Sequence, residues 1–210
     1  MLFDEKIYNY SDAFSYPLPT YLTQLERETG LTTVNPFMSC GPVMGRFLIQ
    51  ISKLAKPFQI LEVGTFTGYS ALCLAHGLQP NGKITCIEVN EEYENIIMKY
   101  FGLAGMSDRL QLIIGDALNV INQLTTRFDL AFIDANKQFN EILFDTIYPM
   151  MNEGGIILVD NVLWYGNVIN NPTDKETRAI VAFNEKIKQD KRLRSYILPI
   201  RDGLFVIEKI

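Results

Sequence analysis

Residues 58–70 read Phe58-Gln-Ile-Leu-Glu-Val-Gly-Thr-Phe-Thr-Gly-Tyr-Ser70, and this stretch decides the fold of the chain. The run 60–63 is short and apolar except for one acid, which is typical of a strand buried on both faces. Gly64 and Gly68 follow it and permit a tight turn into a helix and a close approach of the backbone to a ligand. Their spacing differs from the GxGxxG dinucleotide fingerprint, and the lysine of a phosphate-binding loop is absent. The stretch predicts a strand, a turn and a helix that open a ligand-binding α/β domain.

The same alternation of strands and helices continues downstream. Further apolar runs recur at 84–88, 110–114, 130–133 and 156–159, and helical stretches lie at 69–78, 91–103, 140–151 and 174–191. Residues 196–200 and 204–209 flank Arg201-Asp202-Gly203, where Asp-Gly indicates a hairpin. We therefore expect an α/β fold with a Rossmann-like, doubly wound, mostly parallel seven-stranded sheet, an antiparallel C-terminal edge strand and an N-terminal helical extension.

The first 57 residues differ from the remainder. Apolar residues at helical spacing predict helices at 18–29 and 43–56, which Gly30 and Pro57 are expected to end. We interpret residues 1–57 as a helical cap that is not an independent domain, and residues 58–210 as the ligand-binding domain.

Composition excludes several classes of function. The chain has 210 residues and a net charge of −5 without any run of Lys or Arg, so a nucleic-acid partner is not expected. No apolar stretch reaches the roughly 20 residues that span a bilayer, so no membrane partner is expected. Three cysteines without CxxC spacing fit a reduced, cytoplasmic setting. The single histidine, His76, excludes a two-histidine zinc site and is interpreted as a helix-end residue.

Acidic residues follow the predicted strands one after another. A single acid at such a position is often a helix N-cap, but five in succession are harder to explain by capping alone. Because ligands of open α/β sheets bind at the carboxyl ends of the strands, these side chains are expected to converge on one edge. So much negative charge favours hydroxyls, amines or cations over phosphates as ligands. The five are Glu62, Glu88, Asp116, Asp134 and Asp160.

Two of these acids suggest an adenosyl ligand. Glu88 can accept hydrogen bonds from both hydroxyls of a ribose, and Asp116 can approach the amino group of an adenine. A ligand with a ribose and an adenine but no pyrophosphate fits, and S-adenosylmethionine is the obvious candidate.

Three oxygen-bearing side chains lie at the ends of two other strands. Asp134, Asp160 and Asn161 offer hard ligands without His or Cys, a set that suits Mg²⁺ first and also Mn²⁺ or Ca²⁺. The alternative is that Asp160 and Asn161 only shape a turn and that Asp134 caps a helix.

At these residues the sequence resembles the cation-dependent O-methyltransferases of the caffeoyl-coenzyme A and catechol type. The resemblance runs from about Met38 to the C-terminus and rests on the segments 61–70, 132–137, 160–164 and 201–203. It implies that Lys137 sits beside the acceptor hydroxyl, that Asp134, Asp160 and Asn161 hold the cation, and that the protein is a homodimer. The expected cofactor-binding set is Glu62, Gly64, Thr65, Ser70, Glu88, Val89, Asp116, Ala117 and Asp134; the expected catalytic set is Lys137, Asp134 and Asn161; Met38 and Trp164 are expected at the acceptor.

The chain departs from the family's pattern in three places. Asn136 replaces the second acid of Asp-Ala-Asp-Lys, Asn140 replaces a frequent Tyr, and Gly41-Pro42-Val43-Met44 replaces a Ser-Pro-Glu type segment.

These residues suggest a mechanism. A phenol is a poor nucleophile at neutral pH, and a dication would lower its pKa while Lys137 accepts its proton or stabilises the site it leaves. Trp164 would wall the aromatic ring of the acceptor, although it could equally be a core residue. The alternatives are an NAD-dependent oxidoreductase, a catalytically silent module that binds an adenosyl ligand or a partner, and a methyltransferase that needs no cation.

Overall fold

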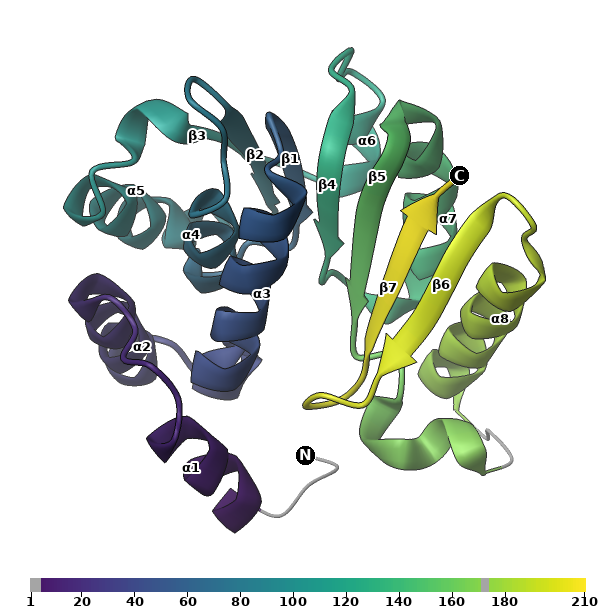
Figure 1. Cartoon of the computed structure of the whole chain (residues 1–210), viewed down its shortest axis with the longest axis horizontal. Coiled ribbons are helices and arrows are strands. Elements are labelled where there is room, and N and C mark those ends of the chain that lie inside the picture. Colours follow the sequence, from purple (N-terminus) through teal and green to yellow (C-terminus); the bar gives the residue numbers. More distant parts are fainter. Residues whose placement is uncertain (1–4, 171–173) are drawn as a thin grey trace.

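The computed structural model describes residues 5–170 and 174–210, and a seven-stranded sheet runs through its centre (Figure 1). The strand order is β3-β2-β1-β4-β5-β7-β6. β1 to β5 are parallel, whereas β7 pairs antiparallel with both β5 and the edge strand β6. The expected doubly wound, mostly parallel sheet with an antiparallel C-terminal strand is confirmed, but that strand, β7, lies between β5 and β6, and β6 forms the edge. The strands are β1 (Gln59–Val63), β2 (Lys83–Glu88), β3 (Leu110–Ile114), β4 (Phe128–Ile133), β5 (Met151–Asp160), β6 (Leu193–Leu198) and β7 (Leu204–Lys209).

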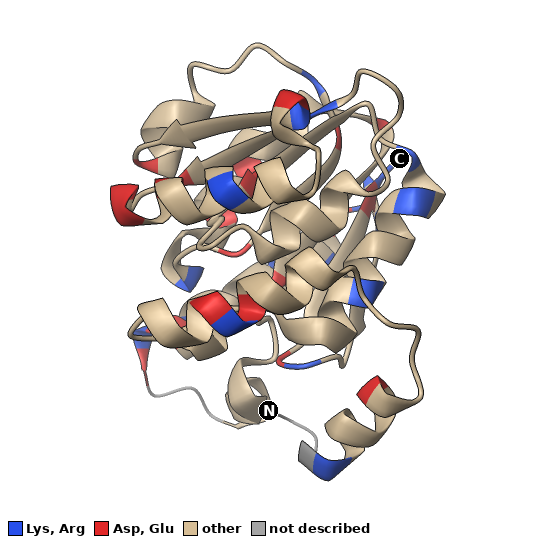
Figure 2. Cartoon of the chain, turned by 90° about the vertical axis from the view of Figure 1, so that its left-hand side faces the viewer, with Lys and Arg blue, Asp and Glu red and all other residues tan. Residues whose placement is uncertain are grey.

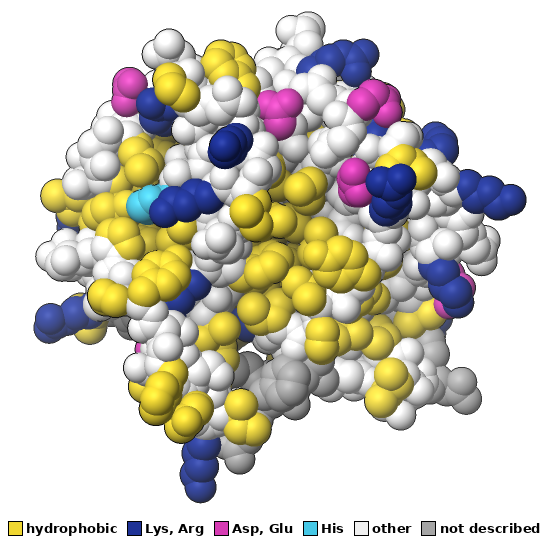
Figure 3. Space-filling model, in the orientation of Figure 1, with side chains coloured by type: hydrophobic (Ala, Val, Ile, Leu, Met, Phe, Trp, Pro, Cys, Tyr) yellow, Lys and Arg dark blue, Asp and Glu magenta, His cyan; other side chains and the backbone are white. Residues whose placement is uncertain are grey.

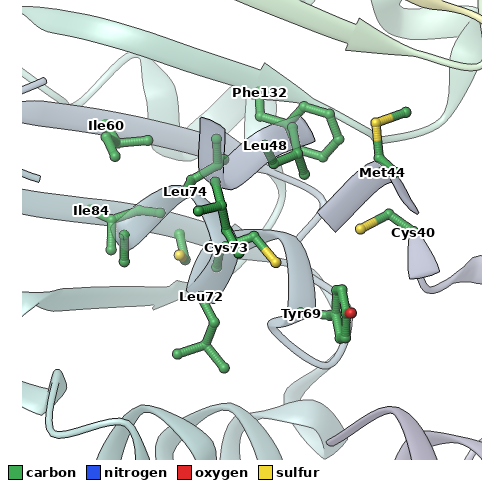
Figure 4. Close-up of a cluster of buried hydrophobic side chains, with 14 of the residues drawn as sticks. Cys40, Met44, Leu48, Ile60, Tyr69, Leu72, Cys73, Leu74, Ile84 and Phe132 are labelled. Carbon is green, nitrogen blue, oxygen red and sulfur yellow. The ribbon is translucent and has the colours of Figure 1, made fainter. Parts of the chain in front are cut away.

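Helices cover both faces of the sheet, which explains why its central strands are apolar almost throughout. Successive residues of one strand point into opposite clusters: Ile60 packs with the helices of one face and Leu61 with those of the other. Figure 4 shows part of the first cluster, where Leu48 lies beside Phe132. One face carries α2 (Thr20–Thr32), α3 (Gly41–Ala55), α4 (Tyr69–Ala75) and α5 (Glu94–Leu103); the other carries α6 (Ala117–Ile121), α7 (Asn140–Ile147) and α8 (Lys175–Gln189).

Short 3₁₀ segments complete the connections. Two of them extend helices that the sequence predicts as single pieces. The predicted helix 91–103 divides into η2 and α5, and the predicted helix 140–151 divides into α7 and η5, with its last residue in β5. The segments are η1 (Pro36–Met38), η2 (Glu91–Tyr93), η3 (Ser107–Arg109), η4 (Lys137–Phe139), η5 (Tyr148–Met150) and η6 (Trp164–Ile169).

The N-terminal helices differ in detail from the sequence-based expectation. The prediction that Gly30 ends a helix is wrong: α2 continues to Thr32, because Gly30 does not adopt the left-handed conformation that stops a helix. α3 ends before Pro57 as expected, with Lys56 in a left-handed C-cap at φ 48°. The sequence analysis missed α1 (Glu5–Ala13), whose described side chains are mostly exposed and therefore show no apolar stripe.

The N-terminal helices pack directly on the sheet domain. Leu25 of α2 and Met44 of α3 belong to the same buried cluster as Ile60 of β1. Arg46 ties α1 to α3, since its guanidinium contacts the carboxylate of Asp12 at 2.5 Å and donates to the carbonyl of Tyr16 at 2.7 Å. This packing brings Tyr8, Glu26 and residues 36–42 to the carboxyl ends of the strands.

The charged residues, the cysteines and the histidine are placed as follows. Over the described residues on the side that Figure 2 presents, Lys and Arg are interspersed with Asp and Glu. None of the described helices is long and apolar enough to cross a bilayer. All three cysteines are buried free thiols. His76 caps the end of α4, and its Nε2 lies 2.7 Å from the hydroxyl of Tyr21.

Candidate active site

A cavity of about 930 Å³ opens at the carboxyl ends of β1, β2, β4 and β5. Glu88, Asp134 and Asp160 all line it, so three of the five strand-end acids meet in one place. The N-terminal segment from α1 to the start of α3 forms another part of the wall. Of the expected site residues, those lining the cavity are Met38, Gly64, Glu88, Val89, Ala117, Asp134, Lys137, Asp160, Asn161 and Trp164; Glu62, Thr65, Ser70 and Asp116 do not line it.

Gly64 forms the turn after β1 at φ 89°. A Cβ atom built there would lie 2.2 Å from the carbonyl oxygen of Asp134. The amide of Asp134 donates to the carbonyl of Val63 at 2.9 Å, so the ends of β1 and β4 are drawn together at this point. Glycine is therefore required by the neighbouring strand, a reason that the sequence analysis did not foresee.

Replacing Gly64 with Ala is expected to lower the free energy of unfolding by at least about 3 kcal/mol, since the substitution adds a backbone clash to an unfavourable φ. Gly154→Ala is the matched control, because Gly154 has φ 74° but no atom near its absent Cβ. The control should cost only about 1 kcal/mol. Urea denaturation measures both values, and equal losses would contradict the steric argument.

Glu88 is held in place by two backbone amides. One of its carboxylate oxygens accepts from Phe66 at 2.6 Å and the other accepts from Asn90 at 2.9 Å. The ring of Phe66 meets that of Tyr93 edge to face, with centroids 4.8 Å apart. Both rings line the cavity beside Glu88, which creates an apolar wall next to a fixed acceptor of hydrogen bonds. This arrangement suits a ribose and a flat base.

Glu62 lies behind the cavity, in the core. Its side chain is fully buried, and neither carboxylate oxygen makes a well-formed hydrogen bond. Burial raises the pKa of Glu62 to about 8, and the hydroxyls of Ser70 and Thr65 offset only part of this rise. A buried carboxyl with so few partners is costly in its charged form, which is why it keeps its proton to a higher pH.

Asp116 behaves as a helix cap. It is exposed, and its carboxylate accepts from the amide of Asn119 at 3.1 Å at the start of α6. The adjacent residues Gly115 and Ala117 line the cavity. For Asp116 the capping interpretation is the one that the geometry supports.

Asp160 and Asp134 form a pair of acids at the ends of β5 and β4. Asp160 is 1% exposed, and its Oδ1 accepts from the amide of Asn161 at 2.8 Å. Burial and the negative charge of Asp134 raise the pKa of Asp160 to about 6, although Lys137 and Arg201 lower it in part. Two like charges at one buried place favour a cation between them.

The donor set for a metal consists of Asp134, Asp160 and the amide of Asn161. Within the described ranges, no group of three His, Cys, Asp or Glu side chains could hold a metal ion. Two carboxylates and an amide oxygen nevertheless suit a hard cation that keeps some of its water. The residues therefore fit Mg²⁺, Mn²⁺ or Ca²⁺ better than zinc.

Lys137 is buried beside this pair. Lys137 is the first residue of η4, and its Nζ lies 2.5 Å from Oδ1 of Asp134. Asn136 is the N-cap of η4 and accepts from the amide of Gln138 at 3.1 Å. The substitution at position 136 thus keeps the cap that fixes Lys137.

The cavity lining also contains residues that the sequence analysis missed as ligand-facing groups. Tyr8 from α1 and Glu26 from α2 line it, together with Arg201 from the β6–β7 loop. Met38 and Trp164 lie in the same wall, and Trp164 also packs against the buried cluster of the second face. Local sequence contains no signal for Tyr8 or Glu26, because only the packing of the helices brings them here.

Comparisons with known proteins show the family to which the chain is similar. A family model described as O-methyltransferase matches residues 12–210. A caffeoyl-CoA O-methyltransferase of Populus kitakamiensis is 31% identical over 79% of this chain and 76% of its own length. One from Stellaria longipes is 28% identical over 100% of this chain and 92% of its own length.

Solved structures are similar over nearly the whole chain. The O-methyltransferase from Bacillus cereus, in complex with SAH, has a TM-score of 0.88 and 28% identity, and 96% of each chain is covered. A SAH-bound methyltransferase of Podospora anserina has a TM-score of 0.89 and 27% identity, with 98% of this chain and 94% of that chain covered.

Proposed function

Since the chain belongs to the O-methyltransferase family and is an S-adenosylmethionine-dependent enzyme of its caffeoyl-CoA branch, we propose that it methylates a hydroxyl of a small catechol-like acceptor with the help of a divalent cation. The observation that carries this proposal is the meeting of Asp134, Asp160, Asn161 and Lys137 in one cavity with Glu88. The oxidoreductase alternative is set aside by the family. The catalytically silent module remains as the outcome that an inactive protein would reveal.

Two carboxyl groups, those of Glu62 and Glu88, match polar groups of S-adenosylmethionine. The carboxylate of Glu88 faces the cavity and is suited to the ribose hydroxyls. Glu62 lies behind the cavity wall, and its buried carboxyl, close to the hydroxyl of Ser70, can accept from the ammonium group of the methionine part once the wall opens to the cofactor. When bound, S-adenosylmethionine supplies a methyl group on a positively charged sulfur, and the acidic cavity favours that charge.

Lys137 and the acid pair act on the acceptor. Asp134, Asp160 and Asn161 would hold the cation, which when bound supplies the positive charge that lowers the pKa of an acceptor hydroxyl. Lys137 lies at Asp134 and can take the proton of the acceptor hydroxyl as a neutral amine, or stabilise the resulting oxyanion as an ammonium. Trp164 borders the cavity and can orient an aromatic ring. Alignment of the acceptor by these side chains contributes several kcal/mol by pre-organisation.

The reaction is tested by transfer of a radiolabelled methyl group to a panel of catechols and matched monophenols, with Mg²⁺ and with chelator. We expect labelled catechols in the presence of Mg²⁺ only. Binding of the cofactor without transfer to any member of the panel would favour the silent module. Transfer that persists with chelator would indicate a methyltransferase that needs no cation.

Glu62→Gln is expected to weaken the binding of S-adenosylhomocysteine about tenfold or more, as for one lost charge-assisted hydrogen bond. The same change should stabilise the cofactor-free protein at high pH. The folded pKa of about 8 exceeds the ordinary value of 4.5, so the unfolded chain ionises first, and stability falls as pH rises between these values.

Calorimetric binding and urea denaturation across that pH range measure the two effects of Glu62→Gln. The exposed Glu185 of α8 supplies the control Glu185→Gln, which should alter neither. Unchanged affinity with the expected change in stability would remove Glu62 from the cofactor site while keeping its burial as the cause of the pKa.

We also propose that the protein is a homodimer. Leu54 of α3 is 69% exposed and Tyr196 of β6 is 55% exposed, and hydrophobic side chains gather between α3 and the β7–β6 pair in Figure 3. An apolar surface of this kind is typical of subunit contacts. Light scattering should give a mass near twice 24.0 kDa, and a mass near 24.0 kDa would contradict the proposal.

A further inference from the structure

Arg201 adopts a backbone conformation that disfavours its own side chain. It has φ 51° in the loop between β6 and β7, which lies in the left-handed region that favours glycine. The glycine of this loop, Gly203, stands two residues further on with its own φ of 87°. A strained residue kept at the wall of a reaction cavity points to a function for its side chain.

The loop holds Arg201 rigidly beside the acid pair. The carboxylate of Asp202 accepts from the amide of Tyr165 at 2.5 Å, and its carbonyl accepts from the amide of Leu163 at 2.9 Å. The carbonyl of Gly203 accepts from the amide of Val162 at 3.1 Å. These bonds fasten the loop to the segment that directly follows Asp160.

The guanidinium of Arg201 has few partners. It donates one hydrogen bond, to the carbonyl of Phe37 at 3.3 Å, and forms no ion pair with any acid of the described ranges. It is near enough to Asp134 and Asp160 for their charges to interact with its own, but it contacts neither. A guanidinium carries five N–H donors, so most of them point to no protein acceptor.

Lys137 and Arg201 are the two cations among the described residues of the cavity wall. Lys137 is paired with Asp134, whereas Arg201 has no carboxylate partner among the described residues. The contact with Phe37 places it next to Met38, on the side where the acceptor is expected. The planar fork of a guanidinium matches the two oxygens of a carboxylate.

We propose that Arg201 selects acceptors that carry a carboxylate away from the reacting hydroxyl. This inference rests on the proposed function and names the class of its substrate, a hydroxylated aromatic acid. A competing explanation is that Arg201 only balances the acids around it, among them Glu26, whose charge also interacts with it. A second competitor is an acceptor with an ammonium group, which Glu26 would bind.

The experiment compares catechols that differ only in one ring substituent: a carboxylate, a hydroxymethyl or an aminomethyl group, each attached directly or through a two-carbon spacer. The readout is the ratio of kcat/KM for the carboxylate to that for the hydroxymethyl acceptor. We expect a preference of about tenfold or more in the wild type with at least one spacer, as for one charge-assisted hydrogen bond.

Four variants separate the explanations. Arg201→Gln should lower the ratio about tenfold or more, and Arg201→Lys should retain part of it because it keeps the charge. Arg201→Gly should also lose the preference, yet melt at or above the wild-type temperature because it relieves the left-handed strain. Glu26→Gln should keep the preference for the carboxylate.

Several outcomes would overturn the inference. Equal ratios in the wild type and Arg201→Gln would leave Arg201 as a balancing charge. A wild-type preference for the aminomethyl acceptor that Glu26→Gln removes would assign selection to Glu26. Equilibrium binding to protein loaded with S-adenosylhomocysteine and Mg²⁺ isolates the proposed reaction: carboxylate binding that depends on Arg201 without any turnover would reject methyl transfer but keep the anion site.

Discussion

Turnover of Lys137→Ala is expected to fall about 10²- to 10⁴-fold, the contribution typical of a positioned general base or stabilising charge. Lys137 is 8% exposed and its Nζ lies 2.5 Å from Oδ1 of Asp134, so the alanine removes a charge that is held at the acid pair. Binding of S-adenosylhomocysteine should persist, because the carboxylates assigned to the cofactor lie at Glu62 and Glu88.

The ion pair with Asp134 makes a second readout necessary. Loss of Lys137 removes a cation that competes for Asp134, so the affinity for Mg²⁺ should rise or stay the same while turnover falls. Lys53→Ala, at an exposed position near the end of α3, is the matched control and should retain full activity. Turnover of Lys137→Ala close to that of the wild type would reject a role for Lys137 in the reaction. A fall that extra Mg²⁺ restores would assign Lys137 to metal binding instead.

Asp160→Asn is expected to lower turnover about 10³-fold at limiting Mg²⁺, and chelation of the wild type should have a similar effect that added Mg²⁺ reverses. A bound dication contributes several kcal/mol of charge stabilisation, and each 1.36 kcal/mol corresponds to about tenfold in rate. The asparagine keeps the shape of the side chain and can still accept from the amide of Asn161, so the change removes little besides the charge.

The stability of Asp160→Asn distinguishes a lost ligand from a damaged fold. Asp160 is buried and repelled by Asp134, so its neutralisation should leave the metal-free protein as stable as the wild type or more stable. Asp145→Asn, at an exposed position of α7 that pairs with Lys186, is the control and should affect neither rate nor metal affinity. Full activity of Asp160→Asn in the presence of chelator would overturn the metal site.

The placement of the strand-end acids was readable from the chain because both signals are local. An apolar run followed at once by an acid indicates a buried strand and its exit, and parallel strands exit at the same edge of the sheet. Glu88, Asp134 and Asp160 meet in the cavity for this reason. The same logic was too coarse for Glu62, which precedes the last residue of β1 and is fully buried in the core.

Asp116 shows that an acid after a strand does not always face a ligand. It follows β3 as the other acids follow their strands, but a helix begins directly after it, and its carboxylate caps that helix. A strand-end acid can therefore serve the ligand or the backbone. The outcome depends on where the next helix starts, which single-sequence patterns place only to within a few residues.

The sequence by itself determined the sheet and its acid-lined edge, because periodicity and strand exits act over a few neighbouring residues. Only the tertiary structure decided which side chains close the cavity on the acceptor side. Tyr8, Glu26 and Arg201 meet there from opposite ends of the chain, and the bond from Arg201 to Phe37 spans 164 positions. Such contacts arise from the packing of α1 and α2 over the finished sheet, so no local pattern encodes them.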